Sequence, residues 1–371
     1  MIEIVSDNII SPLGFSTEEN FQNVLNFKSG LKISDGIFSL DGNFCLSAID
    51  WNLLDLEFEN FFSKSPSQYL KLEKALLLTV GKAIKNIDVT DFRTGFFFSS
   101  TKGNIELLDK NQFSDSRLNL WYTAKMISSF FNNPNIPIVI SNACVSGLCA
   151  IISACRAISS GMIDKAVVFG GDILTKFTLS GFSSLKAMSN KPCRPFDIER
   201  NGLNLGEAVS AMVLKKSDSE NYIAGSIRQD AYHISSPSKT AEGAFNALQE
   251  VLKNIDKNNI AFISAHGTAT IFNDEMEATA ISKAELSEVP ICALKGYFGH
   301  TLGAAGLLET ILSYYALNKG VILKTLGFED LGVSKKIKVT TKNDTTDKQY
   351  FVKLISGFGG VNAAAVFKKK N

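Results

Sequence analysis

Short runs of β-branched and aromatic residues alternate with longer helical patterns along the chain, and this alternation constrains the fold more than any other feature. Such alternation is typical of α/β proteins built on buried parallel strands. Several runs are apolar at every position, as expected when helices cover both faces of a sheet. The predicted strands are Glu3–Val5, Thr94–Ser99, Ile138–Ser141, Ala166–Phe169, Ala211–Leu214, Tyr222–Ile227, Ile260–Ala265, Ile291–Leu294, Phe351–Ser356 and Ala363–Phe367. The predicted helices are Ser67–Lys82, Leu118–Phe130, Val145–Gly161, Ala241–Lys253, Glu275–Ala284 and Ala304–Asn318.

The two halves of the chain show the same order of elements. Each half opens with a strand, carries a strand–turn–helix element in its middle, and ends in an apolar strand rich in small residues. The halves share this order but not their letters, so the internal repeat is a coarse one. The polar stretch 215–221 is the predicted join, which divides the chain into residues 1–217 and 218–371.

Composition excludes several classes of protein. Hydrophobic residues make up 45% and charged residues 20% of the 371 residues, as in ordinary globular proteins. The net charge of +1 gives no reason to expect nucleic acid or a membrane as partner. Six cysteines without paired spacing indicate a reducing compartment. Because there is neither a signal-peptide pattern at the start nor an apolar stretch of membrane-spanning length, we expect a cytoplasmic protein.

Cys144 lies where a predicted strand passes into a long, apolar predicted helix. The partial positive charge at a helix N-terminus lowers the pKa of a thiol and favours the nucleophilic thiolate. This position predicts covalent acyl chemistry at Cys144. The alternative is a small buried core residue, the usual role of a free cysteine. Cys144, Cys149 and Cys155 lie on one predicted helix at intervals of 5 and 6, which matches neither zinc nor iron–sulfur ligand spacing and predicts no metal. We assign the core role to the other five cysteines: Cys45, Cys149, Cys155, Cys193 and Cys292.

Two of the three histidines follow predicted strands, each in a turn of small residues. His266 opens the segment 266–274, and His300 lies within the segment 295–306. Ligand sites in α/β folds lie at the carboxyl ends of strands, and glycines allow a ligand to approach closely. A structural role is the alternative for any single histidine, but the repeated setting favours a function for both. We interpret the third, His233, as structural.

Together these segments resemble the β-ketoacyl-(acyl carrier protein) synthases, the thiolase-fold condensing enzymes of fatty acid and polyketide synthesis. The resemblance covers essentially the whole chain. It implies a thiolase fold, in which two similar α/β halves stack as αβαβα layers. Besides the cysteine and histidine motifs, the segments that carry it are Ser11–Gly14, Arg194–Asp197, Asn201–Ala208, Asp230–Pro237 and Gly357–Gly360.

The resemblance implies a role for each candidate catalytic residue. Cys144 would take an acyl group from a carrier-protein thioester, with an oxyanion hole formed by the backbone N–H groups of Cys144 and Phe358. His266 and His300 would hold the enolate that forms when malonyl-acyl carrier protein loses carbon dioxide. The enolate carbon would then attack the acyl group on Cys144 and release a β-ketoacyl-carrier protein.

Lys295 and Glu309 match the family's buried ion pair beside the second histidine. An unpaired carboxylate in the apolar helix around Glu309 would be costly, which supports the pairing, although a solvent-facing glutamate is the alternative. Thr268 and Thr270 match residues that hydrogen-bond the phosphopantetheine arm, and their alternative role is turn formation. Phe358 matches a gate between the acyl pocket and the malonyl side. The implied substrate-binding residues are Thr268, Thr270, Phe358 and Gly359.

The implied reaction needs no metal or redox cofactor, because its substrates travel on the phosphopantetheine of acyl carrier protein. The implied assembly is a homodimer that extends the sheet across both subunits, and the alternative is a heterodimer with a ketosynthase-like partner that lacks the nucleophile. Cys144 argues against a chain-length-factor subunit, and His300 against an initiating synthase, which carries Asn there. A degradative thiolase would need a second cysteine beyond Cys292. A pure binding module would leave the three motifs unexplained.

The chain departs from the usual elongating synthase outside the Cys-His-His set. It is trimmed around residues 40–95, 215–222 and 236–246, and Val361 stands where Thr is typical. Because of these departures, the resemblance does not define the shape of the acyl pocket or the pathway. Housekeeping fatty acid synthesis and a specialised lipid or polyene pathway are both compatible with it.

Overall fold

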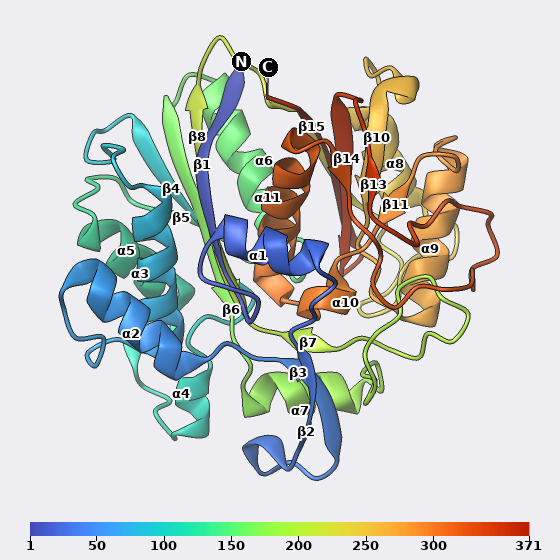
Figure 1. Ribbon diagram of the computed structural model, residues 1–371. Helices are drawn as coiled ribbons and strands as arrows, with labels where there is room; N and C mark the ends of the chain where they lie inside the picture. The colour runs from blue at the N-terminus through green and yellow to red at the C-terminus, as the bar shows by residue number, and fades with distance from the viewer. Residues whose placement is uncertain (371) are drawn as a thin grey trace.

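The computed structural model describes residues 1–370. The chain folds into five layers, in which helices alternate with two five-stranded sheets (Figure 1). This is the αβαβα layering that the sequence predicted. The first sheet contains β1 (Ile2–Ile10), β4 (Thr94–Ser99), β5 (Ile138–Ile140), β6 (Lys165–Asp172) and β8 (Ala208–Lys216). The second contains β9 (Tyr222–Gln229), β10 (Ile260–Ser264), β11 (Ile291–Cys292), β14 (Tyr350–Gly357) and β15 (Val361–Lys368).

The two sheets have the same topology. The order is β5-β4-β6-β8-β1 in the first sheet and β11-β10-β14-β15-β9 in the second, so both read 3-2-4-5-1 when strands are numbered within their half. In both sheets the first three strands run parallel and the remaining pairings are antiparallel. The coarse repeat in the sequence is therefore a repeat of topology, although the letters of the two halves differ.

Two helices form the central layer, α6 (Ser146–Ser159) and α11 (Ala305–Asn318) (Figure 1). Both are buried along nearly their whole length, which explains why apolar residues occur on almost every face. They touch backbone to backbone. A Cβ atom on Gly147 would lie 2.6 Å from the backbone nitrogen of Leu307, and one on Gly306 would lie 2.6 Å from that of Leu148. Only glycine permits this approach.

The outer layers cover the other faces of the sheets. Helices α3 (Lys71–Ala83) and α5 (Leu120–Phe130) pack on the first sheet, with α2 (Trp51–Phe62) against α3. Helices α8 (Glu242–Val251) and α9 (Ile271–Lys283) cover the second sheet. The other elements are α1 (Thr17–Leu25), β2 (Leu31–Asp35), β3 (Asn43–Ser47), α4 (Glu106–Asp109), α7 (Lys176–Ser184), β7 (Leu205–Gly206), α10 (Lys295–Phe298), β12 (Val321–Ile322), β13 (Asp344–Thr345) and four 3₁₀ turns.

All six predicted helices and all ten predicted strands are present, and the ends of most of them are shifted, whereas Thr94–Ser99 matches β4. The predicted strand Ile291–Leu294 is only two residues long, because the chain turns into α10 directly after it. The sequence analysis missed α1, α2, α7 and the β2–β3 hairpin. Within residues 1–370 all six cysteines are free and buried, and no helix has both the length and the apolar character to cross a membrane.

Candidate active site

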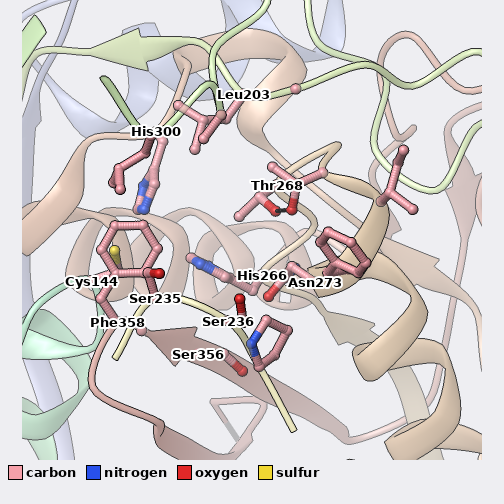
Figure 2. A pocket seen from close by; sticks show the side chains of 18 of the residues that line it. Cys144, Leu203, Ser235, Ser236, His266, Thr268, Asn273, His300, Ser356 and Phe358 are labelled. Atoms are coloured by element: carbon pink, nitrogen blue, oxygen red, sulfur yellow. Dashed lines mark hydrogen bonds between the residues drawn. The ribbon is translucent and has the colours of Figure 1, made fainter. Parts of the chain in front are cut away.

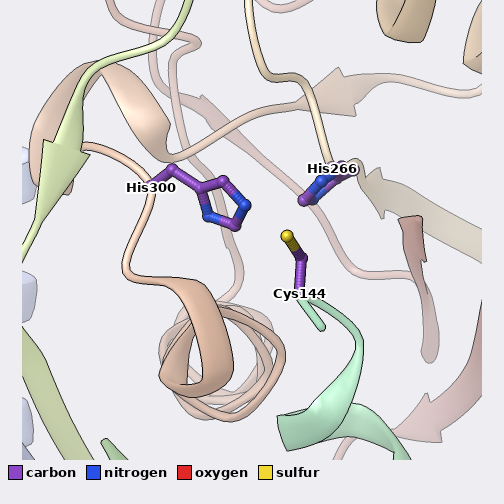
Figure 3. A group of neighbouring side chains, drawn as sticks. All are labelled: Cys144, His266 and His300. Carbon is purple, nitrogen blue, oxygen red and sulfur yellow. The ribbon is translucent and has the colours of Figure 1, made fainter. Parts of the chain in front are cut away.

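Cys144 lies in a sharp turn between β5 and α6. Ala143 has a φ of 46°, a left-handed conformation that residues other than glycine rarely adopt. Ser146 braces the turn, because its hydroxyl donates to the Ala143 carbonyl (2.6 Å) and accepts from the Asn142 N–H (2.8 Å). The thiol is therefore held at the N-terminal end of α6, as predicted, and points towards the two histidines (Figure 3).

The protonation state of the thiol differs from the predicted one. Burial raises the pKa of Cys144 to about 11, and weaker lowering effects come from Lys295, Lys102 and a hydrogen bond from the Phe358 backbone N–H. This shift is opposite to the lowering that the position at the helix terminus predicted, because burial disfavours the charged sulfur. Cys144 rests as a neutral thiol, so its proton must leave during acyl transfer.

His266 follows β10, and its backbone is fixed on both sides. Its N–H donates to Glu277 Oε1 (2.7 Å), and its carbonyl accepts from Lys295 Nζ (2.5 Å). Lys295 Nζ also lies 3.1 Å from the ring Nδ1. Because an ammonium can only donate, Nδ1 is the acceptor and the ring proton is on Nε2.

His300 lies in the loop between α10 and α11, against the short strand β7. Its N–H donates to the Asn204 carbonyl (2.7 Å), and its carbonyl accepts from the Gly206 N–H (3.1 Å), which explains the position of the 201–208 motif. The Leu302 N–H donates to Nδ1 (3.3 Å), so this ring also carries its proton on Nε2. Among residues 1–370 this buried Nε2 has no hydrogen-bond partner, which indicates a position for a ligand oxygen.

The three side chains meet although they come from distant segments. Cys144 Sγ and one nitrogen of each ring lie within 4.8 Å of one another, and the ring centroids are 5.1 Å apart with planes at 82° (Figure 3). Burial, and after it the positive charge of Lys295, holds the pKa of His266 and of His300 well below 6.5. Both rings are therefore neutral at neutral pH and offer N–H donors to an oxyanion.

Lys295 and Glu309 form the predicted buried ion pair, with Nζ and Oε1 2.7 Å apart. Lys295 contacts His266 directly, because β10 and β11 are parallel neighbours and Lys295 follows β11 at the level where His266 follows β10. Its positive charge also acts on His300, the histidine beside which the pair was predicted. A second lysine, Lys353 on β14, contacts the other carboxylate oxygen at 2.7 Å. Burial alone would raise the pKa of Glu309, but the two ammonium groups hold it below its usual value.

The Cys-His-His set opens on a pocket of about 480 Å³ (Figure 2). Thr268 and Thr270 line this pocket, and their hydroxyl oxygens are 2.8 Å apart. Gly267 before Thr268 and Ala269 between the two threonines turn the chain, with φ of 50° and 61°. Asp274 of α9 stabilises the turn by accepting the Thr268 N–H (3.0 Å). The two threonines thus form turns, as in their alternative reading, and also present hydroxyls to the pocket.

Phe358 and Gly359 belong to the turn between β14 and β15. Phe358 lines the pocket and stacks on Phe182 of α7, with ring centroids 5.8 Å apart. Gly359 lies outside the pocket lining. Its φ is 84° and its N–H donates to the Ile234 carbonyl (2.6 Å), so in this structure it shapes the turn.

His233 lies at the mouth of the same pocket and is exposed. Its Nδ1 accepts from the backbone N–H groups of Ser235 and Ser236, both at 3.2 Å. These contacts fit the structural role that the sequence suggested.

The Cys-His-His set also has the composition and the spacing of a metal site. A histidine that binds metal through Nε2 carries its remaining proton on Nδ1. Here Nδ1 of His266 faces the Lys295 ammonium, and Nδ1 of His300 faces the Leu302 N–H. Both contacts favour the opposite tautomer. The arrangement therefore fits two N–H donors better than two metal ligands.

Two buried charged residues of the site, Glu277 and Lys353, were not predicted from the sequence. Glu277 lies three residues after Asp274, so both face the same side of α9, and this spacing was the available signal. Lys353 interrupts the apolar run 351–356, and a lysine inside a strand covered on both faces requires a partner.

Comparisons with known proteins agree with this fold. The family model for the β-ketoacyl synthase N-terminal domain matches residues 1–220, and the model for the C-terminal domain matches residues 222–329. The chain is an acyltransferase of the condensing-enzyme class. It belongs to the β-ketoacyl synthase family, as the resemblance in the sequence implied.

Individual relatives are distant in sequence. The chain is 27% identical to the putative mitochondrial 3-oxoacyl-[acyl-carrier-protein] synthase of Schizosaccharomyces pombe, over 97% of each chain. It is 34% identical to 3-oxoacyl-[acyl-carrier-protein] synthase 2 of Mycobacterium leprae, over 61% of this chain and 59% of that one. In fold it is similar to a chain of the ketosynthase–chain length factor complex of Xenorhabdus doucetiae, with a TM-score of 0.88, 23% identity and coverage of 99% and 98%.

Proposed function

We propose that this chain joins an acyl group held on Cys144 to malonyl-acyl carrier protein by decarboxylative Claisen condensation. The observation that carries the proposal is the convergence of Cys144 Sγ with one ring nitrogen each of His266 and His300 in one pocket. The product is β-ketoacyl-acyl carrier protein. The substrates arrive on the phosphopantetheine arm of the carrier, and the mechanism uses no metal or redox cofactor.

In the first half-reaction the Cys144 sulfur attacks the thioester carbonyl of the acyl-carrier protein. The oxyanion of the tetrahedral intermediate accepts hydrogen bonds from the backbone N–H groups of Cys144 and Phe358, which typically contribute a few kcal/mol each. A Cβ atom on Gly357 would lie 3.3 Å from the Cys144 nitrogen. The backbone around Phe358 is therefore close enough to that of Cys144 for both N–H groups to donate to one oxygen. The thiol proton ends on the departing pantetheine sulfur.

In the second half-reaction malonyl-acyl carrier protein loses carbon dioxide and leaves an enolate. The enolate oxygen accepts from the Nε2–H groups of His266 and His300, and the unpartnered His300 Nε2 supports this assignment. The enolate carbon then attacks the thioester on Cys144. The tetrahedral intermediate collapses, the carbon–sulfur bond to Cys144 breaks, and the thiolate takes a proton from water. Thr268 and Thr270 hydrogen-bond the pantetheine arm, and Phe358 separates the acyl side from the malonyl side.

Reconstitution tests this function directly. The protein is incubated with malonyl-acyl carrier protein and a panel of acyl-carrier proteins of different chain length, and the products are measured by mass spectrometry. We expect a β-ketoacyl-carrier protein two carbons longer than the acyl donor, together with acylated protein. Absence of both species with every donor would contradict the proposal.

We further propose that the chain forms a two-fold dimer through β5. This strand is the edge of the first sheet, and the side chains of Ile136 and Ile138 are 92% and 45% exposed beside it. An exposed apolar edge strand favours pairing with another strand. The alternative partner is a nucleophile-free ketosynthase-like chain, and the structures from X. doucetiae and of the ishigamide system are ketosynthase–chain length factor complexes.

The expected result for the purified chain is twice the monomer mass by light scattering at micromolar concentration. Ile136→Asp should shift the chain towards monomer, because it places a charge on the paired edge. A wild-type chain that stays monomeric alone, but pairs when a chain length factor is added, would replace the homodimer with the heterodimer.

The remaining assignments are part of the same proposal. We propose residues 1–217 and 218–371 as the two domains, since β8 ends at Lys216 and β9 begins at Tyr222. The cytoplasmic location stays a prediction, because the S. pombe relative is named as mitochondrial. Both fatty acid synthesis and a specialised polyketide or polyene lipid pathway fit the site.

A further inference from the structure

Lys353 is a charged residue in the middle of a buried strand. Its side chain is 0% exposed on β14, between the second sheet and the central helices. Removing an ammonium from water costs several kcal/mol unless it is well paired, so the site must supply its partners. The reaction steps given above use no atom of Lys353.

Burial lowers the pKa of Lys353 and Glu309 opposes this effect, so the contacts of Nζ must support its charged form. Its Nζ lies 2.7 Å from Glu309 Oε2, 3.0 Å from the Ser264 carbonyl and 3.1 Å from the Ala265 carbonyl. A neutral amine has only two N–H groups, whereas an ammonium has three. Three acceptors around one nitrogen therefore indicate the charged form.

Lys295 is bound in the same way. Its Nζ contacts Glu309 Oε1 (2.7 Å), the His266 carbonyl (2.5 Å) and the His266 Nδ1 (3.1 Å). The two ammonium groups thus hold the three successive carbonyls from Ser264 to His266, and one carboxylate lies between them. This is the chain segment that ends β10 and sets the direction of the His266 ring.

Two ammonium groups on one carboxylate leave an excess positive charge beside His266. Glu277 of α9 also faces this segment, but burial raises its pKa to about 7, so it supplies less than a full negative charge at neutral pH. The other titratable groups around His266 are Asp274 of α9, His300 before α11 and Cys144 before α6.

We propose that Lys353 is a positioning residue of the condensation, which fixes the end of β10 and supplies the excess positive charge that keeps His266 neutral and stabilises the enolate. The inference rests on the proposed function, because it assigns Lys353 to the decarboxylation half-reaction. Lys353 thus joins Lys295 and Glu309 in one buried charged group. It acts on His266 by binding the backbone carbonyls before it and by its positive charge.

The sign of the pH effect follows from the geometry. The charge of Lys353 is one of the causes, after burial, Lys295 and His300, that lower the pKa of His266. Removal of this charge raises that pKa, so His266 gains a proton at a higher pH. A proton on Nδ1 would face the Lys295 ammonium and break the 3.1 Å contact that orients the His266 ring. Decarboxylation should then fail earlier as the pH falls.

Lys353→Met is the first test. We expect the acidic limb of the pH profile for malonyl decarboxylation to move up by about one pH unit. Acylation of Cys144, measured by intact mass, should stay near the wild-type level. The double variant Lys353→Met/Glu309→Gln again leaves one net positive charge, on Lys295, so its acidic limb should return towards the wild-type position. A purely structural role would make the double variant no better than the single one.

Lys348→Met is the matched control. Lys348 Nζ donates to the Ile260 carbonyl (3.2 Å) at the opposite end of β10, so this variant should leave the acidic limb in place. An unshifted limb in Lys353→Met, or no return in the double variant, would overturn the inference. Wild-type protein that never acylates Cys144 would instead overturn the proposed function.

A measurement on the wild-type protein covers the case in which Lys353→Met fails to fold. The chain has only three histidines, so ¹⁵N NMR of the ring nitrogens can be assigned with single His variants. We expect His266 to be neutral and protonated at Nε2 at pH 6. A His266 ring that carries both protons at that pH would contradict the inference.

Discussion

Replacing Cys144 with Ala should abolish acyl loading and lower the condensation rate by at least about 10⁴-fold, because no other group in the pocket can form the thioester. Loading is measured as the mass increase of the intact protein after incubation with acyl-carrier protein. The modified residue is then mapped in the wild-type protein. The fold should persist, since a buried thiol is replaced by a methyl group, and the melting temperature checks this.

Cys149→Ala is the matched control for this variant. Cys149 is also buried on the first turns of α6, but it lies outside the pocket lining. It should load acyl groups at the wild-type level. An acyl group mapped to any residue other than Cys144 would remove the basis of the proposed mechanism.

Replacing either His266 or His300 with Ala should separate the two half-reactions. Each variant loses one of the two donors to the enolate oxygen, so malonyl decarboxylation should fall by about 100- to 1,000-fold. Acylation of Cys144 should continue, because its oxyanion hole is built from backbone N–H groups. The measurements are carbon dioxide release from malonyl-acyl carrier protein and intact mass after acyl loading.

His233→Ala is the control for the loss of an imidazole at the same pocket. Its ring is exposed and accepts from backbone N–H groups of its own loop, so decarboxylation should fall by less than about tenfold. A His266 or His300 variant that decarboxylates malonyl-acyl carrier protein at the wild-type rate would contradict the assigned role.

The positions of the catalytic residues could be predicted from the sequence because they follow strands in both halves. Cys144 follows β5 and His300 follows β11, and these are the corresponding third strands of the two repeats. The strand–turn–helix pattern around each residue is local, so it can be recognised in the sequence. That the remote segments converge in one pocket depended on the family resemblance.

The electrostatics could not be predicted, because they depend on depth and on neighbours remote in the chain. The helix terminus suggested a thiolate at Cys144, yet burial raises the pKa of this thiol to about 11. The partners of Glu309 lie 14 and 44 residues away in the sequence, and only the first of them, Lys295, was foreseen. The hairpin formed by β2 and β3 was missed because its alternation is broken by turns and exposed apolar residues.

The contact between α6 and α11 limits how the two halves can move. With Gly147 and Gly306 in backbone contact, no side chain can yield between the helices, so they cannot shear past each other without collision. The contact between these two helices therefore fixes the distance between Cys144, which precedes α6, and His300, which precedes α11. The loops 231–237 and 357–360 line the pocket outside this helix contact, and the Gly359 N–H joins them by donating to the Ile234 carbonyl.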